Sequence, residues 1–313
     1  MTPQLALDWV RHVRADPRTR RIQVVLRAVF YPCALALVAF MGVQAARDTK
    51  FETINFWPLA GAYLAALVWW GCLAFGWASL VADDITLRPV TAWCRTQVAR
   101  YIPGGIWAAV ARATTVRGRV RDKFTAVTAE NVLVLLGSLT VAGLWAAGYQ
   151  PQWLLLSLLV VASVAAARWL ERRSGITRRR AHRSAVSYLV GFVAYGIMSV
   201  LVQVAVSGPR PVPQLAYVAG AACVAWAVGL VVVLAPGGVG VREVVYVWML
   251  IGLFPRTGLE AAAVTSRLVT VLAELTALAL AYHWDHFGSG ELTAPVDAVP
   301  ASSASHSERQ RPT

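Results

Sequence analysis

Long apolar runs recur along most of this sequence, and arginine-rich stretches separate them. Most of the runs have the length that an α-helix needs to cross a lipid bilayer. Hydrophobic residues form 58% of the chain and charged residues only 14%, a balance that excludes a soluble two-domain protein. We therefore predict an all-α, polytopic membrane helix bundle of about eight segments, with one or two re-entrant or broken helices. The predicted segments are residues 28–46, 57–82, 124–148, 153–170, 184–206, 215–235, 239–254 and 259–283.

The distribution of charge predicts how these segments are oriented. The formal net charge is +13, and the arginines gather in every second loop. Arginine-rich loops stay in the cytoplasm, so we predict a multi-pass protein of the cell (plasma) membrane with a cytoplasmic N-terminus. Nucleic acid is not an expected partner, because no basic soluble fold is available to bind it. The predicted cytoplasmic loops are 1–27, 83–123 and 168–183, and the predicted outer loops are 47–56, 149–152 and 208–214.

Composition divides the chain into a basic cytoplasmic N-terminal segment (1–27), a transmembrane domain (28–285) and a tail (286–313). The Ser, Ala and Pro content of the tail predicts disorder. Two alternatives stay open. Val43-Gln44-Ala45 resembles a signal-peptide cleavage site, although the run before it has the length of a span, which favours an uncleaved helix. Segment 239–254 is borderline in length, so the C-terminus is cytoplasmic if it spans and outside if it is re-entrant.

The stretch 236–243, with the sequence PGGVGVRE, lies between two apolar runs and predicts a broken turn at membrane depth. Proline cannot continue a helix, and glycine permits backbone angles that other residues avoid. The N–H groups at the start of the next helix, near Val239, suit an anion. Arg242 adds a fork of donors that matches phosphate. The alternative is a tight cytoplasmic turn, with Arg242 reaching into the lipid headgroups.

A second copy of this pattern, Pro103-Gly104-Gly105-Ile106, has Arg100 and Arg112 beside it. Paired Gly/Pro interruptions in two halves of a chain point to a binding site in transporter-like folds. They also suggest a possible internal repeat, which the loop charges would make parallel. The helix after this copy is too short to span, so we expect a re-entrant or interfacial helix, with a cytoplasmic amphipathic loop as the alternative. The candidate lipid- and phosphate-binding residues are Arg100, Pro103, Gly104, Gly105, Arg112, Pro236, Gly237, Gly238, Gly240 and Arg242.

PGGVGVRE at 236–243 and RYIPGGIWAAVAR at 100–112 resemble the lysylphosphatidylglycerol synthase transmembrane family, also called flippase-like. The resemblance covers the chain from about Arg88 to His283. Glu130 and Arg267 sit where the family pattern also places charge. The resemblance implies an integral membrane protein of lipid and cell-envelope metabolism. The soluble aminoacyl-transfer domain of the full-length synthases is not expected, because no sizeable polar domain occurs, and lysyl transfer is not carried over.

Four charged residues inside or beside apolar segments form a predicted intramembrane charge network: Glu130, Glu243, Arg267 and Glu274. Charge at this depth usually faces protein or water, so these side chains should lie in the bundle interior. Glu260, Arg267 and Glu274 are spaced to share one helix face. We expect at least one contact between Arg242 or Arg267 and these glutamates. For Glu130, reaching back to the interface is an equal alternative. Trp69-Trp70 is expected to contact lipid or to pack in the interior.

Three classes of function fit the sequence. The leading hypothesis is a flippase-like protein that binds and translocates a phosphate-bearing lipid, either a phospholipid or a polyprenyl-phosphate-linked glycan, in cell-envelope metabolism. The alternatives are a membrane enzyme of lipid-linked glycan synthesis and a non-catalytic membrane partner of a separate envelope enzyme. Asp83-Asp84 lacks the further acidic residues that a metal-diphosphate enzyme needs, and no known catalytic or nucleotide-binding motif occurs. We therefore expect a transporter-like protein without catalytic residues, metal or other cofactor, whose partners are anionic membrane lipids; its oligomeric state stays open.

Overall fold

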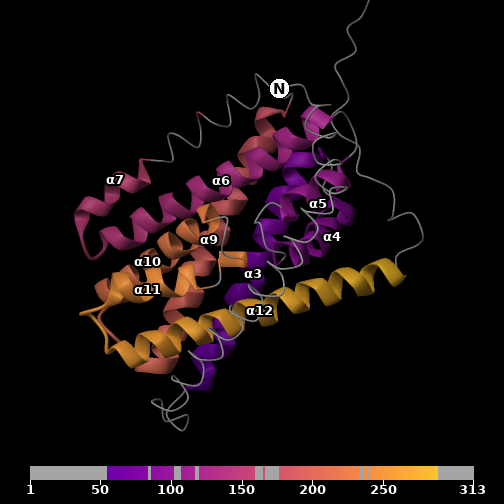
Figure 1. Ribbon diagram of the computed structural model, residues 1–313. Helices are drawn as coiled ribbons and strands as arrows, with labels where there is room; N and C mark the ends of the chain where they lie inside the picture. Colours follow the sequence, from indigo (N-terminus) through magenta and orange to yellow (C-terminus); the bar gives the residue numbers. More distant parts are fainter. Residues whose placement is uncertain are drawn as a thin grey trace, which may run out of the picture.

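The computed structural model is helical almost throughout (Figure 1). It describes residues 55–83, 86–101, 107–116, 120–158, 165, 176–232, 236–238 and 240–287. Within these ranges no β-strand occurs, although Ile251 and Phe254 form an isolated bridge. Five helices there are long and apolar enough to cross a membrane. They are α3 (Phe56–Val81), α6 (Val120–Ala147), α9 (Arg178–Ser207), α10 (Val212–Val231) and α12 (Arg256–Phe287).

Short helical segments connect or flank these five. Two of them follow the positions of the PGG sequences: α5 (Trp107–Thr115) and α11 (Val241–Leu250). In the chain, the first PGG sequence comes after the short helix α4 and the 3-10 helix η2 rather than directly after a span. The remaining short segments are α4 (Leu87–Thr96), η2 (Gln97–Tyr101), η3 (Pro151–Trp153), α7 (Leu154–Ser157) and η4 (Pro236–Gly238).

The long helices follow the apolar runs closely, because each run is bounded by residues that end a helix or by charge. The largest shift is at α9, which begins at Arg178 instead of residue 184. Segment 239–254 contains only the ten-residue helix α11. The segments 1–27 and 28–46, most of 153–170 and nearly all of the tail 286–313 lie outside the described residues.

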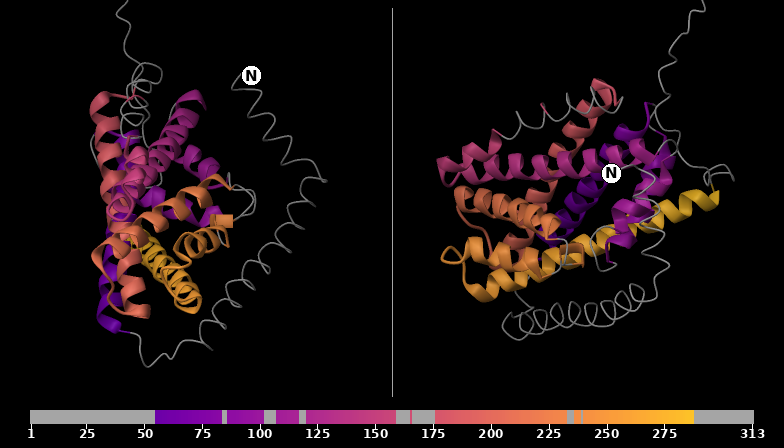
Figure 2. Two further views of the ribbon diagram at one scale, coloured as in Figure 1. Left: turned by 90° about the vertical axis from the view of Figure 1, so that its left-hand side faces the viewer. Right: turned by 45° about the horizontal axis from the view of Figure 1, so that its top comes forward.

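Helices α3 and α9 form a closely packed antiparallel pair (Figure 1). At one end, the Asn55 N–H donates to the Ala205 carbonyl at 3.2 Å. At the other end, Arg180 Nη2 donates to the Leu80 carbonyl at 2.7 Å. Along this pair, α6 packs on α10, α10 on α11, and α11 on α12. In the left view of Figure 2, α9 lies at the left and α12 to its right. Helices α6, α10, α11 and α12 therefore lie on one side of the α3–α9 pair.

Small residues bring the long helices close together. A Cβ added to Gly76 of α3 would lie 2.3 Å from the Tyr188 ring of α9. A Cβ added to Gly220 of α10 would lie 2.9 Å from Ala146 of α6 and 3.0 Å from its backbone nitrogen. Close backbone approach at small residues is how membrane helices gain packing energy, since lipid offers no hydrophobic drive for their association.

Helix α12 carries its apolar and charged side chains on opposite faces. Leu268, Leu272 and Leu275 are each 55% exposed and lie on one stripe, because they are spaced by three or four residues. Arg267 and Glu274 are buried against the rest of the bundle. A soluble helix has the reverse arrangement. Apolar groups outside and charge inside are what a lipid environment favours, and this supports a multi-pass membrane protein.

The structure corrects the placement of Arg180 in a cytoplasmic loop. Residues 178–183 form the first turns of α9, and Arg180 is only 2% exposed. Its guanidinium bonds the Leu80 carbonyl, and its Nη1 lies 3.8 Å from Asp83 Oδ2. The last carbonyls of a helix have no intrahelical donor, and a cation there also matches the helix dipole. Arg180 therefore joins the start of α9 to the end of α3.

Candidate functional site

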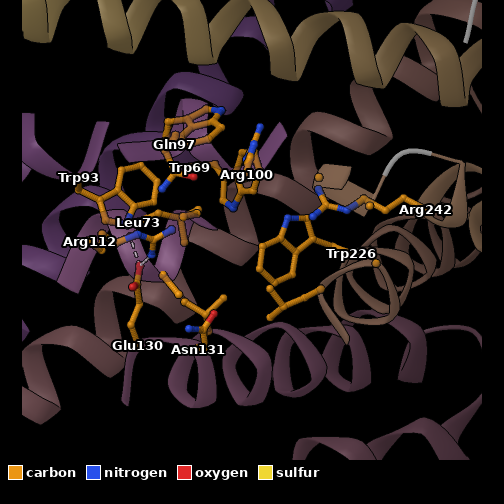
Figure 3. A pocket seen from close by; sticks show the side chains of 18 of the residues that line it. Trp69, Leu73, Trp93, Gln97, Arg100, Arg112, Glu130, Asn131, Trp226 and Arg242 are labelled. Atoms are coloured by element: carbon orange, nitrogen blue, oxygen red, sulfur yellow. Dashed lines mark hydrogen bonds and ion pairs between the residues drawn. The ribbon is translucent and has the colours of Figure 1, made fainter. Parts of the chain in front are cut away.

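A cavity of about 130 Å³ lies between α3, α6, α10 and the short helices α4 and α5 (Figure 3). The η4 turn at Gly237 and Gly238 closes part of it. Its walls hold two kinds of side chain that rarely meet in a membrane interior. The charged ones are Arg100, Arg112, Glu130 and Arg242, and the aromatic ones are Trp69, Trp70, Trp93 and Trp226.

Two residues that line the cavity lie well inside the long helices α3 and α6. Glu130 is about 15 Å along α6 from its first residue, Val120. Trp70 is about 16 Å along α3 from its last residue, Val81. The charged start of α6 ends at Lys123, so Glu130 lies about 10 Å inside the apolar part of α6, whereas Trp70 lies near the middle of α3. If these helices cross a bilayer, the charged side chains of the cavity lie within it, and charge at that depth usually has a function.

Arg242 reaches the cavity from the first turn of α11. Its guanidinium lies over the Trp226 ring, with Cζ 5.0 Å from the ring centroid. Its Nε is buried without a hydrogen-bond partner, and none of the described residues forms an ion pair with it. Figure 3 shows Arg242 and Trp226 together at the right of the cavity. Stacking on an aromatic face offsets only part of the cost of burying a cation, so the N–H groups of Arg242 can still bind an anion.

Two glycines make the room that the Arg242 side chain occupies. A Cβ added to Gly229 of α10 would lie 2.5 Å from Arg242 Cγ, and one added to Gly238 would lie 2.6 Å from its Nε. Gly238 has φ of 71°, and Gly240, the N-cap of α11, has φ of 83°, both in the region that favours glycine. Gly238 thus has a second role besides the turn, because together with Gly229 it lets Arg242 fold back against α10.

On the other side of the cavity, Arg112 and Glu130 form a buried ion pair. Glu130 Oε1 also accepts a hydrogen bond from Trp93 Nε1 at 2.7 Å. The Arg112 guanidinium lies over the same tryptophan, with Cζ 5.6 Å from the ring centroid. Glu130 is 3% exposed, so it points into the bundle and does not reach back to the interface.

Arg100 forms the second ion pair, with Glu274 of α12. Its Cζ lies 4.8 Å from the centroid of the Trp70 ring. The pair joins the end of η2 to the middle of α12, and Glu274 is 5% exposed. Two of the three predicted phosphate-binding arginines are thus matched by carboxylates, whereas no carboxylate in the described part of the chain pairs with the third, Arg242.

The tryptophans form a continuous aromatic wall. Neighbouring ring centroids lie 5.2 Å apart between Trp93 and Trp70, 5.2 Å between Trp70 and Trp69, and 6.5 Å between Trp69 and Trp226. Three of the four rings carry a stacked arginine. The sequence alone predicts only lipid contact or packing for Trp69 and Trp70. Their place in the middle of a span, away from the interfaces where tryptophan usually lies, was the signal for a further role.

A second, smaller cavity of about 40 Å³ adjoins Arg242 between α9, α11 and α12. Glu243 and Arg267 line it together with Tyr195 and Tyr246. Glu243 is 5% exposed, and its Oε2 has no hydrogen-bond partner. Arg267 Nη1 donates to the Gly237 carbonyl at 3.4 Å.

These contacts correct the expected pairing of the charge network. We expected Arg242 or Arg267 to contact a glutamate, but in the described part of the chain neither forms an ion pair. Glu274 of α12 bonds Arg100, and Glu130 of α6 bonds Arg112. Those arginines come from the short helical segments around the first PGG sequence, which therefore reach the bundle interior.

The two PGG regions approach the same cavity as far as the structure describes them. Gly237 and Gly238 line it from one side, and Arg100 and Ala108 line it from the other. Pro103, Gly104 and Gly105 themselves lie outside the described residues. Gly240 caps α11, and Pro236 begins η4. Helix α11 begins at Val241, two residues later than expected.

Comparison with known proteins adds no name to this site. No family model matches the sequence, and neither the curated proteins nor the solved structures gave a match. Within the described ranges, no group of three or more His, Cys, Asp or Glu side chains could hold a metal ion. The site has to be interpreted from its own chemistry.

Proposed function

We propose that this protein is a flippase-like membrane protein that binds a phosphate-bearing lipid in the arginine–tryptophan cavity and moves its headgroup across the membrane. The lipid is a phospholipid or a polyprenyl-phosphate-linked glycan. The observation that carries the proposal is Arg242, a cavity-lining guanidinium at membrane depth without a hydrogen bond or ion pair from the described residues. A lipid headgroup is the natural anion at that depth.

The chemistry around Arg242 supports an oxyanion ligand. Guanidinium donors form bidentate bonds to phosphate oxygens, and these bonds strengthen where water is excluded. The first N–H groups of α11 have no intrahelical acceptor and carry partial positive charge. The tryptophan faces offer apolar contact to the glycerol, sugar or prenyl part next to the phosphate.

The short helices support a membrane site built from broken segments. Helix α11 has ten residues and a length of about 15 Å, half the thickness of the hydrocarbon core. Helix α5 has nine residues. In our proposal both are re-entrant and meet at the cavity, as broken helices do in transporters. The same proposal includes a cytoplasmic N-terminus and about eight segments. It also includes membership of the lysylphosphatidylglycerol synthase transmembrane family.

The lining favours binding and translocation over catalysis. Among the described residues, the cavity wall contains no Ser, Thr, Cys or His, so it offers no ordinary nucleophile. Its single carboxylate, Glu130, already bonds Arg112 and Trp93. General acid–base chemistry needs a group that is available for proton transfer.

Lipid binding and lipid movement are tested with the same two variants. The protein is purified in mild detergent, and the co-purified lipids are identified by mass spectrometry. Arg242→Ala should lose most of the bound anionic lipid, whereas Arg179→Ala, at an exposed position on α9, should retain it. In liposomes with a fluorescent phospholipid, wild-type protein should make the inner-leaflet label accessible to a membrane-impermeant quencher, and Arg242→Ala should not. Equal lipid retention by the two variants would overturn the proposal.

The conservative variant tests the chemistry of the contact. Arg242→Lys keeps the charge but replaces a planar fork by a point charge, and it should restore only a small part of the binding. Full rescue by lysine would mean that simple charge attraction, without bidentate geometry, holds the headgroup.

A further inference from the structure

Unused hydrogen-bonding groups gather in the second cavity, next to Arg242. Glu243 of α11 is 5% exposed, and its Oε2 has no hydrogen-bond partner among the described residues. Arg267 of α12 is 9% exposed, and its Nη2 has none either. The buried Oγ of Ser266, the neighbouring residue on α12, is in the same position. Because buried polar groups in proteins are normally bonded, these three atoms indicate a place for a polar ligand group.

We infer that the second cavity binds a hydroxyl group of the lipid headgroup while Arg242 binds its phosphate. This inference rests on the proposed function and specifies its substrate class, which is a lipid whose phosphate carries a polyol or a sugar. Arg242 lines both cavities, so a headgroup that is bound to it can extend into the second one.

A hydroxyl is the headgroup function that matches both kinds of unpaired atom. The carboxylate oxygen of Glu243 needs a hydrogen-bond donor, and the guanidinium nitrogen of Arg267 needs an acceptor. A hydroxyl group both donates and accepts. An ammonium group offers no acceptor and would lie close to the Arg242 and Arg267 cations. A trimethylammonium group offers neither a donor nor an acceptor.

The size of the second cavity agrees with this assignment. Its volume is about 40 Å³, whereas one water-sized group needs about 10–15 Å³. The hydroxyl-bearing edge of a glycerol or of a sugar therefore fits. A ligand hydroxyl that displaces water from the cavity replaces its hydrogen bonds, whereas a methyl group in the same place loses them.

The probes are two pairs of phosphodiesters. Dioctanoyl phosphatidylglycerol and dioctanoyl phosphatidylpropanol have the same chains and one negative charge each, but only the first has headgroup hydroxyls. Farnesyl glucosyl phosphate and farnesyl cyclohexyl phosphate form the corresponding pair with a sugar. Since the charge is equal within a pair, a difference in affinity reports the hydroxyl groups. Binding is measured on the full chain in dodecyl maltoside micelles by tryptophan fluorescence, because Trp226 stacks on Arg242.

Wild-type protein should bind the hydroxylated lipid about tenfold more tightly than its hydroxyl-free partner in at least one pair, which corresponds to about 1.4 kcal/mol. The pair that shows this preference identifies the source of the hydroxyl, a glycerol or a sugar. Glu243→Ala should abolish the preference. Ser266→Ala, a small change that keeps every charge, should reduce it and serves as the test if Glu243→Ala does not fold. Glu260→Ala removes a carboxylate of α12 outside both cavities and should leave the preference unchanged.

The inference is overturned if wild-type protein binds both members of each pair equally, which would mean that water alone fills the second cavity. It is also overturned if neither Glu243→Ala nor Ser266→Ala reduces the preference. In both cases Arg242→Ala would still weaken the binding of all four lipids. Failure of the proposed function would instead leave Arg242→Ala like Arg179→Ala.

Discussion

Replacing Glu130 by alanine should lower the free energy of unfolding by about 3–5 kcal/mol, because it leaves a buried guanidinium without its carboxylate. Glu130 is 3% exposed and Arg112 is 9% exposed, so the guanidinium stays buried in the bundle after its partner is removed. Arg112 would keep its stacking on Trp93, which contributes about 0.5–2 kcal/mol. That contribution is smaller than the cost of the unpaired ion.

Two further variants separate charge from hydrogen bonding. Glu130→Gln retains an oxygen that can accept from Trp93 Nε1, whose bond to Glu130 is 2.7 Å long, but it removes the negative charge. Neutral hydrogen bonds inside membrane proteins contribute only about 0.6 kcal/mol on average, so most of the loss should persist in Glu130→Gln. The double variant Arg112→Gln/Glu130→Gln buries no net charge and should be more stable than Glu130→Gln alone.

The chain offers an exposed ion pair as a matched control. Arg256 Nε lies 2.8 Å from Glu260 Oε1 at the start of α12, and Arg256 is 74% exposed. Glu260→Ala should therefore cost only about 0.3–0.5 kcal/mol. Unfolding is followed by tryptophan fluorescence in dodecyl maltoside micelles as the fraction of dodecyl sulfate increases. The reasoning is refuted if Glu130→Ala costs no more than Glu260→Ala, or if the double variant is less stable than Glu130→Gln.

Three other predictions follow. Gly220→Ala should destabilise the protein by about 1–3 kcal/mol, because the added Cβ would lie 3.0 Å from the α6 backbone. Gly71→Ala is the control and should not change stability, because no atom lies within 4 Å of the added Cβ; equal melting temperatures of the two variants would contradict this. Arg180→Ala should cost about 1–3 kcal/mol by leaving the Leu80 carbonyl unbonded, and Arg179→Ala less than about 0.5 kcal/mol, measured by the same dodecyl sulfate unfolding. A cysteine at Arg179 should react with impermeant maleimide only from the cytoplasm, and one at Gln152 only from outside; the reverse pattern would invert the topology.

Most of the helices could be predicted from the sequence because lipid imposes simple local rules. A span must be apolar and long enough, and it ends where charge, proline or glycine occurs. The predicted segments 57–82 and 124–148 therefore differ by only a few residues from α3 and α6. The turn at 236–238, the short helix after it and the burial of Glu130 and Glu274 follow from equally local arguments about glycine, proline and the cost of charge in lipid.

The pairing of the charges was decided only by the tertiary structure. Sequence spacing places Arg267 and Glu274 on one face of α12, but it does not say which side chain stands opposite. Contacts between residues far apart in the chain depend on how helices cross and on where glycines let them approach. For this reason Glu274 bonds Arg100, and Arg180 leaves its loop to cap α3. For the same reason no carboxylate of the described residues pairs with Arg242, which lies between Gly229 and Gly238 beside the four tryptophans of the cavity.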